Sequence, residues 1–344
     1  MLLLPCRSCV FQFATSSDSQ ILRKWNMKKI AIVCCYLGQL PNYFHLWLQS
    51  CAANPTIDWL FFTDQKISDL PGNVKCFPTH LEELRKLCKE KIAPETILPL
   101  AYKVCDYKPR YGVMFEEYLA GYDFWGYCDF DMIFGNLRSF FTEELLARFD
   151  KILTLGHLSI YRNTPEINQR FRCPCSKLDL KKVIVTEKTC AFDEWRGIYT
   201  IYKENGFSMY DEVPFADISC MKKRLTLHRR SSAKYKAPAP DFCRQTFYWE
   251  NGELYRAYVD GGMVKTDTFL YIHLARRKFP APPRLEAFYC TQGGFVEKRA
   301  GTLPSAKEIQ KLNPYYGRLY EWIETRIRRK AMKRENHRRF ALHP

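Results

Sequence analysis

The sequence lacks a long hydrophobic run. No stretch of its 344 residues approaches the roughly eighteen consecutive apolar positions that a membrane-spanning helix needs. Near the start, the apolar run Leu2 to Leu4 is broken by Pro5 and Arg7, and it is too short for the core of a signal peptide. Because Met27 directly precedes the first strand-like segment, we expect it to be the natural start and residues 1–26 to be a disordered extension.

Acidic residues are scarce relative to basic ones, with 37 Asp and Glu against 53 Lys and Arg and a formal net charge of +16. Part of the excess lies at the end of the chain, where residues 318–344 hold nine Lys or Arg and three Glu. A basic surface attracts nucleic acids, anionic lipids or phosphorylated substrates. The charge alone does not distinguish among these partners.

The fifteen cysteines lack a pattern. The close pair Cys173 and Cys175 has no second pair at the spacing of a zinc ribbon. Several other cysteines lie in apolar strand-like runs, where a thiol packs as a small hydrophobic group. Without a secretion signal, we expect reduced thiols and a cytoplasmic location.

The first part of the chain alternates between strand-like and helix-like segments. Ile30 to Cys35 is a continuous apolar run, typical of a strand buried on both faces. A helix is expected over 43–53 and a second strand over 57–63, which together form a βαβ unit with parallel strands. We therefore predict an α/β fold with a mostly parallel central sheet flanked by helices.

Further elements are expected along the chain. The pattern predicts helices over 81–91, within 99–119 and over 137–149, and a strand over 122–127. After residue 155 the alternation weakens. There we expect a hairpin over 247–258 around Asn251-Gly252, a strand over 269–274, a proline-rich linker near 280, and a basic helix over 315–340.

Two aspartates carry the strongest chemical signal. Asp129 and Asp131 flank Phe130 just after an apolar strand, so alternation along an extended chain predicts both carboxylates on one side and the ring in the core. Open α/β sheets bind ligands at the carboxyl ends of their strands. Carboxylate oxygens suit Mg²⁺ or Mn²⁺, which would offset the charge of a diphosphate. The structural alternative is a solvated pair of aspartates or a helix cap.

The residues around this motif carry a family resemblance. The stretch Tyr102 to Pro109 (YKVCDYKP), followed by Tyr122 to Gly135 (YDFWGYCDFDMIFG), resembles a bacterial family of uncharacterised glycosyltransferases often found among capsule and lipopolysaccharide genes. This resemblance covers Met27 to about Phe279. More distantly, the part from Ile30 to Leu137 is similar to the GT-A superfamily, whose D-x-D motif binds Mn²⁺ or Mg²⁺ and the donor diphosphate.

The resemblance implies a GT-A-like fold and a glycosyltransferase of the hexosyltransferase type. Its donor would be a nucleotide-diphospho-sugar, with UDP as the nucleotide by analogy, and its acceptor a saccharide or a lipid-linked saccharide in cell-surface polysaccharide synthesis. We accordingly divide the chain into an extension (1–26), a nucleotide-sugar-binding half (27–155), an acceptor-binding half (156–279), and a linker with a basic helical tail (280–344).

The resemblance also implies a donor-binding set at the ends of the first two strands and in and upstream of the D-x-D motif: Cys35, Tyr36, Asp64, Lys103, Asp106, Lys108 and Asp129. A carboxylate there accepts sugar hydroxyls, and a cation offsets diphosphate charge. Lys108 stands where distant relatives carry arginine, and Arg110 is the alternative cation. For Asp106 the structural alternative is a helix cap before Lys108.

The later half supplies the remaining candidates. The resemblance implies His273 as a third metal ligand beside Asp129 and Asp131, and a core histidine bonded to backbone is the alternative. Asp193 and Glu194 are candidates for a general base or for acceptor recognition, against an ordinary acidic helix start. Two further residues are expected to contact the acceptor: Trp195, by stacking on a sugar face, and His157.

Three other functions compete. A nucleic-acid-binding protein would place cations between aromatic residues on a sheet or groove, whereas much of the basic excess here lies in the tail, so no nucleic-acid partner is expected. A sugar nucleotidyltransferase would have a glycine-rich, basic loop after the first strand, but Cys35 to Gln39 has one glycine and no cation. An inactive scaffold is disfavoured by the intact D-x-D motif.

The basic helix suggests a further partner. Leu319, Trp322, Ile323 and Ile327 form an apolar stripe at helical spacing, bordered by the cations Arg326, Arg328, Arg329, Lys330, Lys333 and Arg334. This pattern is typical of a helix that lies in the headgroup layer of an anionic inner leaflet. Such a helix would place the protein peripherally on the inner face of the plasma membrane. The alternative is that the stripe packs on the protein's own core.

Overall fold

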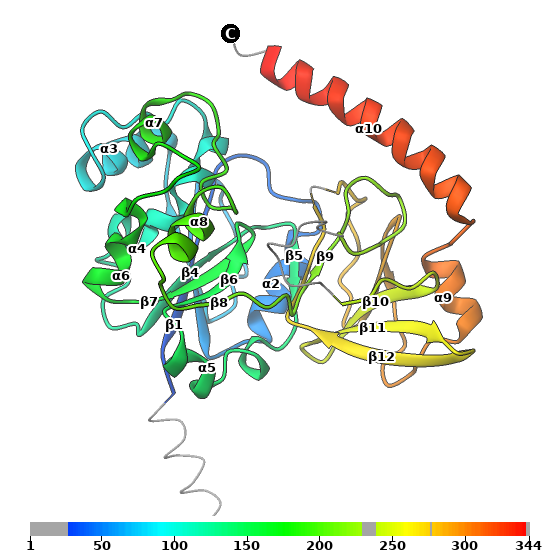
Figure 1. Cartoon of the computed structure of the whole chain (residues 1–344). Helices are drawn as coiled ribbons and strands as arrows, with labels where there is room; N and C mark the ends of the chain where they lie inside the picture. The colour runs from blue at the N-terminus through cyan, green and yellow to red at the C-terminus, as the bar shows by residue number, and fades with distance from the viewer. Residues whose placement is uncertain (1–26, 229–238, 276, 342–344) are drawn as a thin grey trace, which may run out of the picture.

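The computed structural model describes residues 27–228, 239–275 and 277–341. The expected extension over 1–26 therefore lies outside the described residues. Three sheets organise the chain, with seven, five and three strands. Figure 1 shows the seven-stranded sheet with its helices on one side of the molecule and the five-stranded sheet on the other. The short strands β5 (Met132–Phe134) and β9 (Ala216–Asp217) of the third sheet lie between them.

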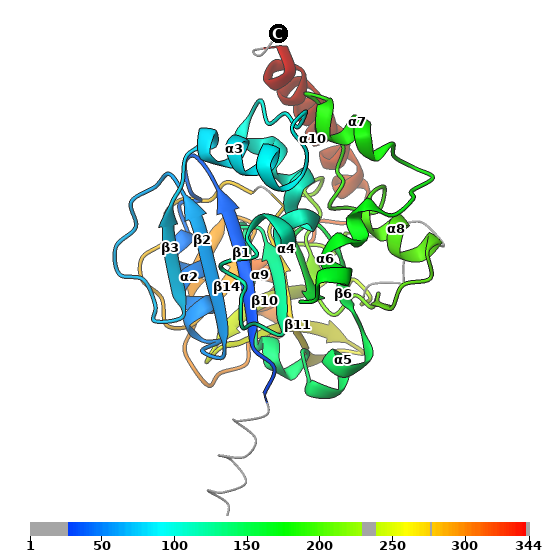
Figure 2. The same cartoon turned by 90° about the vertical axis from the view of Figure 1, so that its left-hand side faces the viewer.

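The seven-stranded sheet confirms the predicted α/β class. Its order is β3-β2-β1-β4-β7-β6-β8. The four parallel strands are β1 (Ile30–Tyr36), β2 (Ile57–Thr63), β3 (Val74–Pro78) and β4 (Phe124–Cys128). Next come β7 (Leu158–Arg162), antiparallel to β4, then β6 (Lys151–Leu155) and the short β8 (Met209–Tyr210). Figure 2 shows β3, β2 and β1 side by side. The domain boundary predicted at residue 155 falls within the β6–β7 hairpin, so both halves share this sheet.

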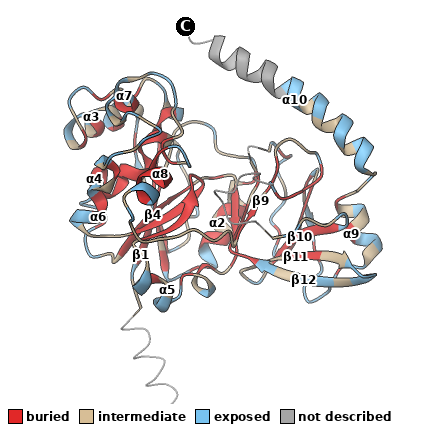
Figure 3. Cartoon of the chain, in the orientation of Figure 1, coloured by how far each residue is buried: buried red, intermediate tan, exposed pale blue. Residues whose placement is uncertain are grey.

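Helices cover both faces of this sheet because its strands are apolar on both. In β1, Ala31 and Val33 enter one core cluster, and Ile30, Ile32 and Cys34 enter another. The first cluster includes residues of five helices: α3 (Leu81–Lys91), α4 (Tyr111–Met114), α6 (Pro165–Gln169), α7 (Leu180–Val185) and α8 (Ile198–Glu204). The second includes residues of α2 (Phe44–Ala52) and α5 (Glu143–Arg148). Figure 3 shows the strands of this sheet mostly in the colour of buried residues.

The five-stranded sheet is antiparallel, with the order β12-β11-β10-β14-β15. The strands β10 (Gln245–Glu250) and β11 (Glu253–Asp260) form the predicted hairpin. Asn251 (φ 53°) and Gly252 (φ 80°) both take the left-handed conformation that a tight two-residue turn requires. The prediction of a linker and tail over 280–344 is too broad, because β14 (Phe288–Thr291), β15 (Gly294–Glu297) and α9 (Ala306–Leu312) lie there and β14 pairs with β10.

The three-stranded sheet joins the two larger ones. It consists of β5 (Met132–Phe134), β13 (Tyr271–His273) and β9 (Ala216–Asp217), with β13 in the middle. The single strand predicted over 269–274 is therefore wrong in one respect. Phe269 ends β12 (Met263–Phe269) in the five-stranded sheet, and the chain re-pairs after Leu270 in a different sheet.

Two predicted helices are also interrupted. The helix expected over 137–149 is a short 3₁₀ turn (Leu137–Ser139) followed by α5, because the side chains of Asn136 and Thr142 each accept a bond from a backbone N–H and begin a separate helix. The helical run expected within 99–119 is a 3₁₀ helix (Ala101–Arg110) and then the short α4.

The chain ends in α10 (Arg318–Ala341), close to the basic helix predicted over 315–340. Among the helices of the described residues, including α10, none combines the length and the apolar character that a bilayer crossing requires.

A lysine lies buried inside the seven-stranded sheet. Lys151 begins β6 and is fully buried, and its Nζ donates to Ser159 Oγ at 3.0 Å and to the carbonyl of Leu153. Burial, opposed by the charge of Glu194, lowers the pKa of Lys151 from its usual 10.5 to about 7. The neutral amine can keep both hydrogen bonds, so folding favours the deprotonated form.

We predict that the Lys151→Met variant has a larger free energy of unfolding than the wild type near pH 7. This difference should shrink toward pH 10. Between the folded and the unfolded pKa the unfolded wild type binds more protons, so its free energy of unfolding rises with pH by up to about 1.4 kcal/mol per unit. Methionine does not titrate, so residue 151 adds no pH dependence to the free energy of unfolding of the variant. Urea denaturation at several pH values measures the difference, with the exposed Lys86→Met as the control. Equal pH slopes for wild type and Lys151→Met would contradict this account.

Candidate functional site

The D-x-D motif lies where the chain leaves the seven-stranded sheet for the three-stranded one. Phe130 is 4% exposed and packs against the rings of Phe61 and Trp47, with centroids 4.8 and 4.9 Å away. Asp129 and Asp131 flank this anchored ring and bring their carboxylates to the same place. The predicted alternation is confirmed.

A distant histidine completes a cluster with these carboxylates. Candidate ligand atoms of Asp129, Asp131 and His273 all lie within 4.8 Å of one another. The pairing of β13 with β5 places His273 opposite Met132, and the N–H of Leu274 donates to the carbonyl of Asp131 at 2.7 Å. His273 Nε2 is 3.5 Å from Asp131 Oδ1. Two carboxylates and an imidazole form a donor set that Mn²⁺ accepts.

A third carboxylate, Asp217, fixes the orientation of this histidine. Strand β9 pairs Asp217 with His273, and Asp217 Oδ1 is 2.8 Å from His273 Nδ1. A carboxylate on one ring nitrogen leaves the other nitrogen available to a metal. Sequence reasoning missed Asp217, which lies in a two-residue strand without a recognisable motif.

The charges around His273 favour its protonated form while no metal is bound. Burial alone would lower the pKa of His273, but the carboxylates of Asp131 and Asp217 raise it well above the usual value. A metal ion would have to displace this proton, because only the neutral imidazole is a ligand. The cluster therefore already holds a positive charge at the place where a cation would bind.

His157, predicted to contact the acceptor, lies beneath the cluster. It is 3% exposed, its ring stacks on that of His273 with centroids 4.3 Å apart, and its Nδ1 is 2.8 Å from the Tyr271 hydroxyl. These contacts support the position of His273. The predicted acceptor role of His157 is not needed to explain its burial.

A buried cation bridges the motif to a second carboxylate. Lys108 Nζ is 2.5 Å from Asp129 Oδ1, 3.4 Å from Asp193 Oδ2 and 2.8 Å from the carbonyl of Gly156. Burial alone would lower the pKa of Lys108, but the two carboxylates raise it well above its ordinary value. The alternative cation, Arg110, is buried elsewhere, with its guanidinium 4.2 Å from the ring centre of Phe192. Lys108 is thus the cation at the D-x-D motif.

The two acidic candidates of the later half lie next to this lysine. Asp193 is 5% exposed, and burial, opposed by Lys108, raises its pKa to about 7. Glu194 Oε1 accepts a hydrogen bond from the N–H of Gly156 at 3.3 Å. A Cβ at Gly156 would collide with the Asp193 carboxylate, so this close approach requires glycine. Trp195 follows and is 41% exposed.

Lys103 and Asp106 have structural partners that explain them without a ligand. Lys103 Nζ donates to Asp106 Oδ2 at 3.1 Å and to two backbone carbonyls. The buried Asp106 accepts from the N–H groups of Cys190 and Phe192, and so it fixes the segment that leads into Asp193. It lies inside the 3₁₀ helix, so the helix-cap interpretation of Asp106 is wrong. Their donor-binding roles stay predictions.

The remaining donor candidates lie at the carboxyl ends of β1 and β2. Asp64 is exposed and accepts from the N–H of Gly38 at 2.9 Å, and the Tyr36 hydroxyl donates to the carbonyl of Gln39 at 3.1 Å. Cys35 is half-buried, and burial raises the pKa of its thiol to about 12. The parallel register places these strand ends at the same sheet edge as Asp129.

The arrangement as a whole suits a divalent cation and an anionic ligand. Four carboxylates, from Asp129, Asp131, Asp193 and Asp217, surround one lysine and one histidine. The excess of negative charge attracts a metal ion, and Lys108 adds a fixed positive charge beside it.

A comparison with models of protein families places the chain in a known sequence family. The model of a family of unknown function, DUF6625, matches residues 32–299. No curated protein matches the chain. The matched range begins within β1 and ends just after β15, so it contains every candidate residue above, whereas α9 and α10 lie outside it.

We predict that the wild type binds Mn²⁺ and that Asp131→Asn and Asp129→Asn abolish this binding, because a neutral amide is a poor ligand for a hard cation. Asp217→Asn, which only disturbs the orientation of His273, should weaken binding about 10- to 100-fold. Titration calorimetry or the electron paramagnetic resonance of free Mn²⁺ measures the affinity. The exposed Asp260→Asn is the control. Equal affinity for Asp131→Asn and Asp260→Asn would rule out this metal site.

Proposed function

We propose that this chain, which belongs to the DUF6625 family of unknown function, is a metal-dependent glycosyltransferase with a GT-A-like fold. Its donor would be a nucleotide-diphospho-sugar, with a UDP-sugar as the first choice. The observation that carries the proposal is the cluster of Asp129, Asp131 and His273, supported by Asp217, at the carboxyl ends of the parallel strands β1, β2 and β4.

The diphosphate of the donor would bind beside this cluster. A divalent cation held there supplies positive charge to the diphosphate as it leaves the sugar. Lys108 lies against Asp129 and is charged, so it can add a second positive charge without a large movement. The nucleoside would extend along the strand ends, toward Tyr36 and the exposed carboxylate of Asp64.

The sugar and the acceptor would meet near Asp193. In the transfer, the bond between the sugar C1 and the diphosphate oxygen breaks, and its electron pair stays on the diphosphate. A bond forms between C1 and the acceptor hydroxyl oxygen, whose proton passes to a carboxylate or to the departing diphosphate. Asp193, with a pKa of about 7 set chiefly by burial, can hold such a proton near neutral pH. Glu194 and the exposed Trp195 would contact the acceptor.

The test measures nucleoside diphosphate release from a panel of nucleotide sugars with Mn²⁺ and saccharide acceptors. We expect one donor to react, and we expect Asp131→Asn and Asp193→Asn to lower the rate about 100-fold or more. The control Asp260→Asn should retain the wild-type rate, because this residue lies at an exposed hairpin end.

Two results would contradict the proposal. Full turnover by Asp131→Asn, or by the wild type in excess chelator, would exclude the metal-dependent reaction. In a separate assay, formation of a nucleotide sugar from a nucleoside triphosphate and a sugar 1-phosphate, with release of pyrophosphate, would identify a nucleotidyltransferase. Melting temperatures of all variants, measured in parallel, separate a lost activity from a lost fold.

A further inference from the structure

The last helix exposes an apolar stripe to the surroundings. In α10, the exposed fractions of Leu319, Trp322, Ile323 and Ile327 are 71, 53, 45 and 63%. Figure 3 shows the described turns of this helix largely in the colour of exposed residues. The alternative that the stripe packs on the protein's own core is therefore wrong.

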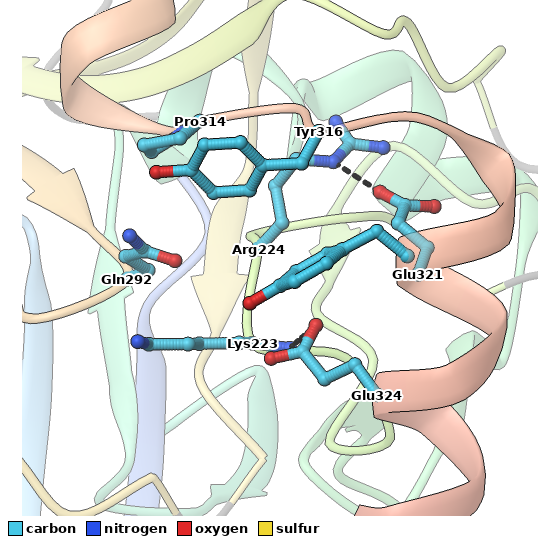
Figure 4. A pocket seen from close by; sticks show the side chains of 8 residues that line it. Lys223, Arg224, Gln292, Pro314, Tyr316, Glu321 and Glu324 are labelled. Atoms are coloured by element: carbon cyan, nitrogen blue, oxygen red, sulfur yellow. Dashed lines mark hydrogen bonds and ion pairs between the residues drawn. The ribbon is translucent and has the colours of Figure 1, made fainter.

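The opposite side of α10 attaches the helix to the body through polar contacts. Glu321 accepts from Arg224 Nε at 2.6 Å and from Lys222 Nζ at 2.9 Å, and Arg328 donates to the carbonyl of Lys222 at 3.0 Å. Glu324 accepts from the N–H of Lys223. Figure 4 shows Glu321 bonded to Arg224 and Glu324 beside Lys223.

The acidic and the exposed basic residues of the helix lie on different sides. Both acidic residues between 318 and 331, Glu321 and Glu324, lie on the body side, one helical turn apart. The exposed charged residues of the same segment are all basic: Arg318, Arg326, Arg329 and Lys330. The guanidinium of Arg326 lies 4.2 Å from the ring centre of Trp322, so cation and apolar stripe share one surface. The outward face is therefore apolar and cationic, with no carboxylate among its described residues.

Two exposed aromatic side chains lie at the base of the helix, next to this face. Tyr316 and Tyr320 are 65 and 49% exposed, and their ring centres are 5.1 Å apart. They line an open cavity of about 360 Å³ together with Lys223 and Glu324. Figure 4 shows Tyr316 at this cavity. Tyrosine and tryptophan are enriched where a surface meets both lipid and water.

We propose that α10 binds the surface of an anionic lipid bilayer, with its apolar stripe at the level of the acyl chain boundary and its cations among the headgroups. An outward face that is both apolar and cationic favours this partner. A neutral surface would be complementary only to the apolar stripe, and a soluble polyanion only to the cations. The helix lies on the bilayer and does not cross it. This inference does not rest on the proposed transferase activity, since binding is measured without donor or acceptor.

Co-sedimentation with vesicles tests the proposal on the full chain. One set of vesicles contains equal parts of phosphatidylglycerol and phosphatidylcholine, and the other contains phosphatidylcholine alone. The wild type should sediment with the first set at low salt and stay in the supernatant with the second. Glutamine substitutions keep helix propensity high and remove one property at a time.

Two triple variants of the helix remove the stripe or the cations. The apolar variant carries Leu319→Gln, Ile323→Gln and Ile327→Gln, and the cation variant carries Arg326→Gln, Arg329→Gln and Lys330→Gln. We expect the first to lower the partition coefficient at least about tenfold and the second to lower it about 100-fold.

Two matched variants elsewhere serve as controls. Each changes three exposed residues of the same kind near the five-stranded sheet. The apolar control carries Met263→Gln, Val296→Gln and Leu303→Gln, and the cation control carries Arg299→Gln, Lys307→Gln and Lys311→Gln. Both should sediment as the wild type does, and circular dichroism of all four variants should match that of the wild type.

Several outcomes would overturn the proposal. A wild type that stays in the supernatant with both vesicle sets would do so directly, and gel filtration would then show whether the stripe joins two copies of the chain. An apolar variant that sediments as well as the wild type would indicate a charge patch for soluble polyanions such as nucleic acids. Equal losses in the cation variant and the cation control would indicate attraction by net charge alone.

Discussion

The pairing of β13 with its two neighbours is the constraint on which the candidate site depends. On one side β13 pairs with β5, which continues directly from the D-x-D motif, and on the other side it pairs with β9, which carries Asp217. The register of this three-stranded sheet places His273 opposite Asp217 on one side and opposite Met132, the residue after Asp131, on the other. A shift of β13 by one residue would turn His273 to the other face and dismantle the cluster.

The electrostatics of this region fit the proposed metal ion. Four carboxylates crowd around Lys108 and His273, and Asp193 is held with a raised pKa although it lies 3.4 Å from the lysine. Such groups are costly to bury unless they have partners. Here each cation has more than one carboxylate beside it, which leaves negative charge for an incoming metal ion to offset. Functional sites commonly hold groups with perturbed pKa values.

Local patterns in the sequence predicted the local structure well. The strands of the first βαβ unit, the hairpin at Asn251-Gly252 and the burial of Phe130 all follow from alternation, β-branched runs or turn residues, which act over a few positions. The caps at Asn136 and Thr142 are equally local, but each consists of one side chain beside a helical pattern of apolar residues. That pattern therefore predicted one continuous helix over 137–149, and the two caps were missed. The re-pairing of the chain at Leu270 depends on partners far away in the sequence and left no local signal.

The same contrast holds for the site. Asp129, Asp131 and His273 were predicted through a motif and a resemblance, and the structure brings them together, while Asp217 was missed because nothing near it marks a supporting role. Lys103 and Asp106 lie in the same matching stretch as Lys108, yet their contacts are those of a buried anchor. Only the packing distinguishes a residue that supports a site from one that faces it.

Diffraction from crystals soaked with Mn²⁺ and UDP, recorded for the anomalous signal of manganese, tests the central claim most directly. We expect a single strong peak bounded by the side chains of Asp129, Asp131 and His273, with the diphosphate on its open side near Lys108. A nucleotide bound elsewhere, or a cluster without manganese at saturating concentration, would contradict it.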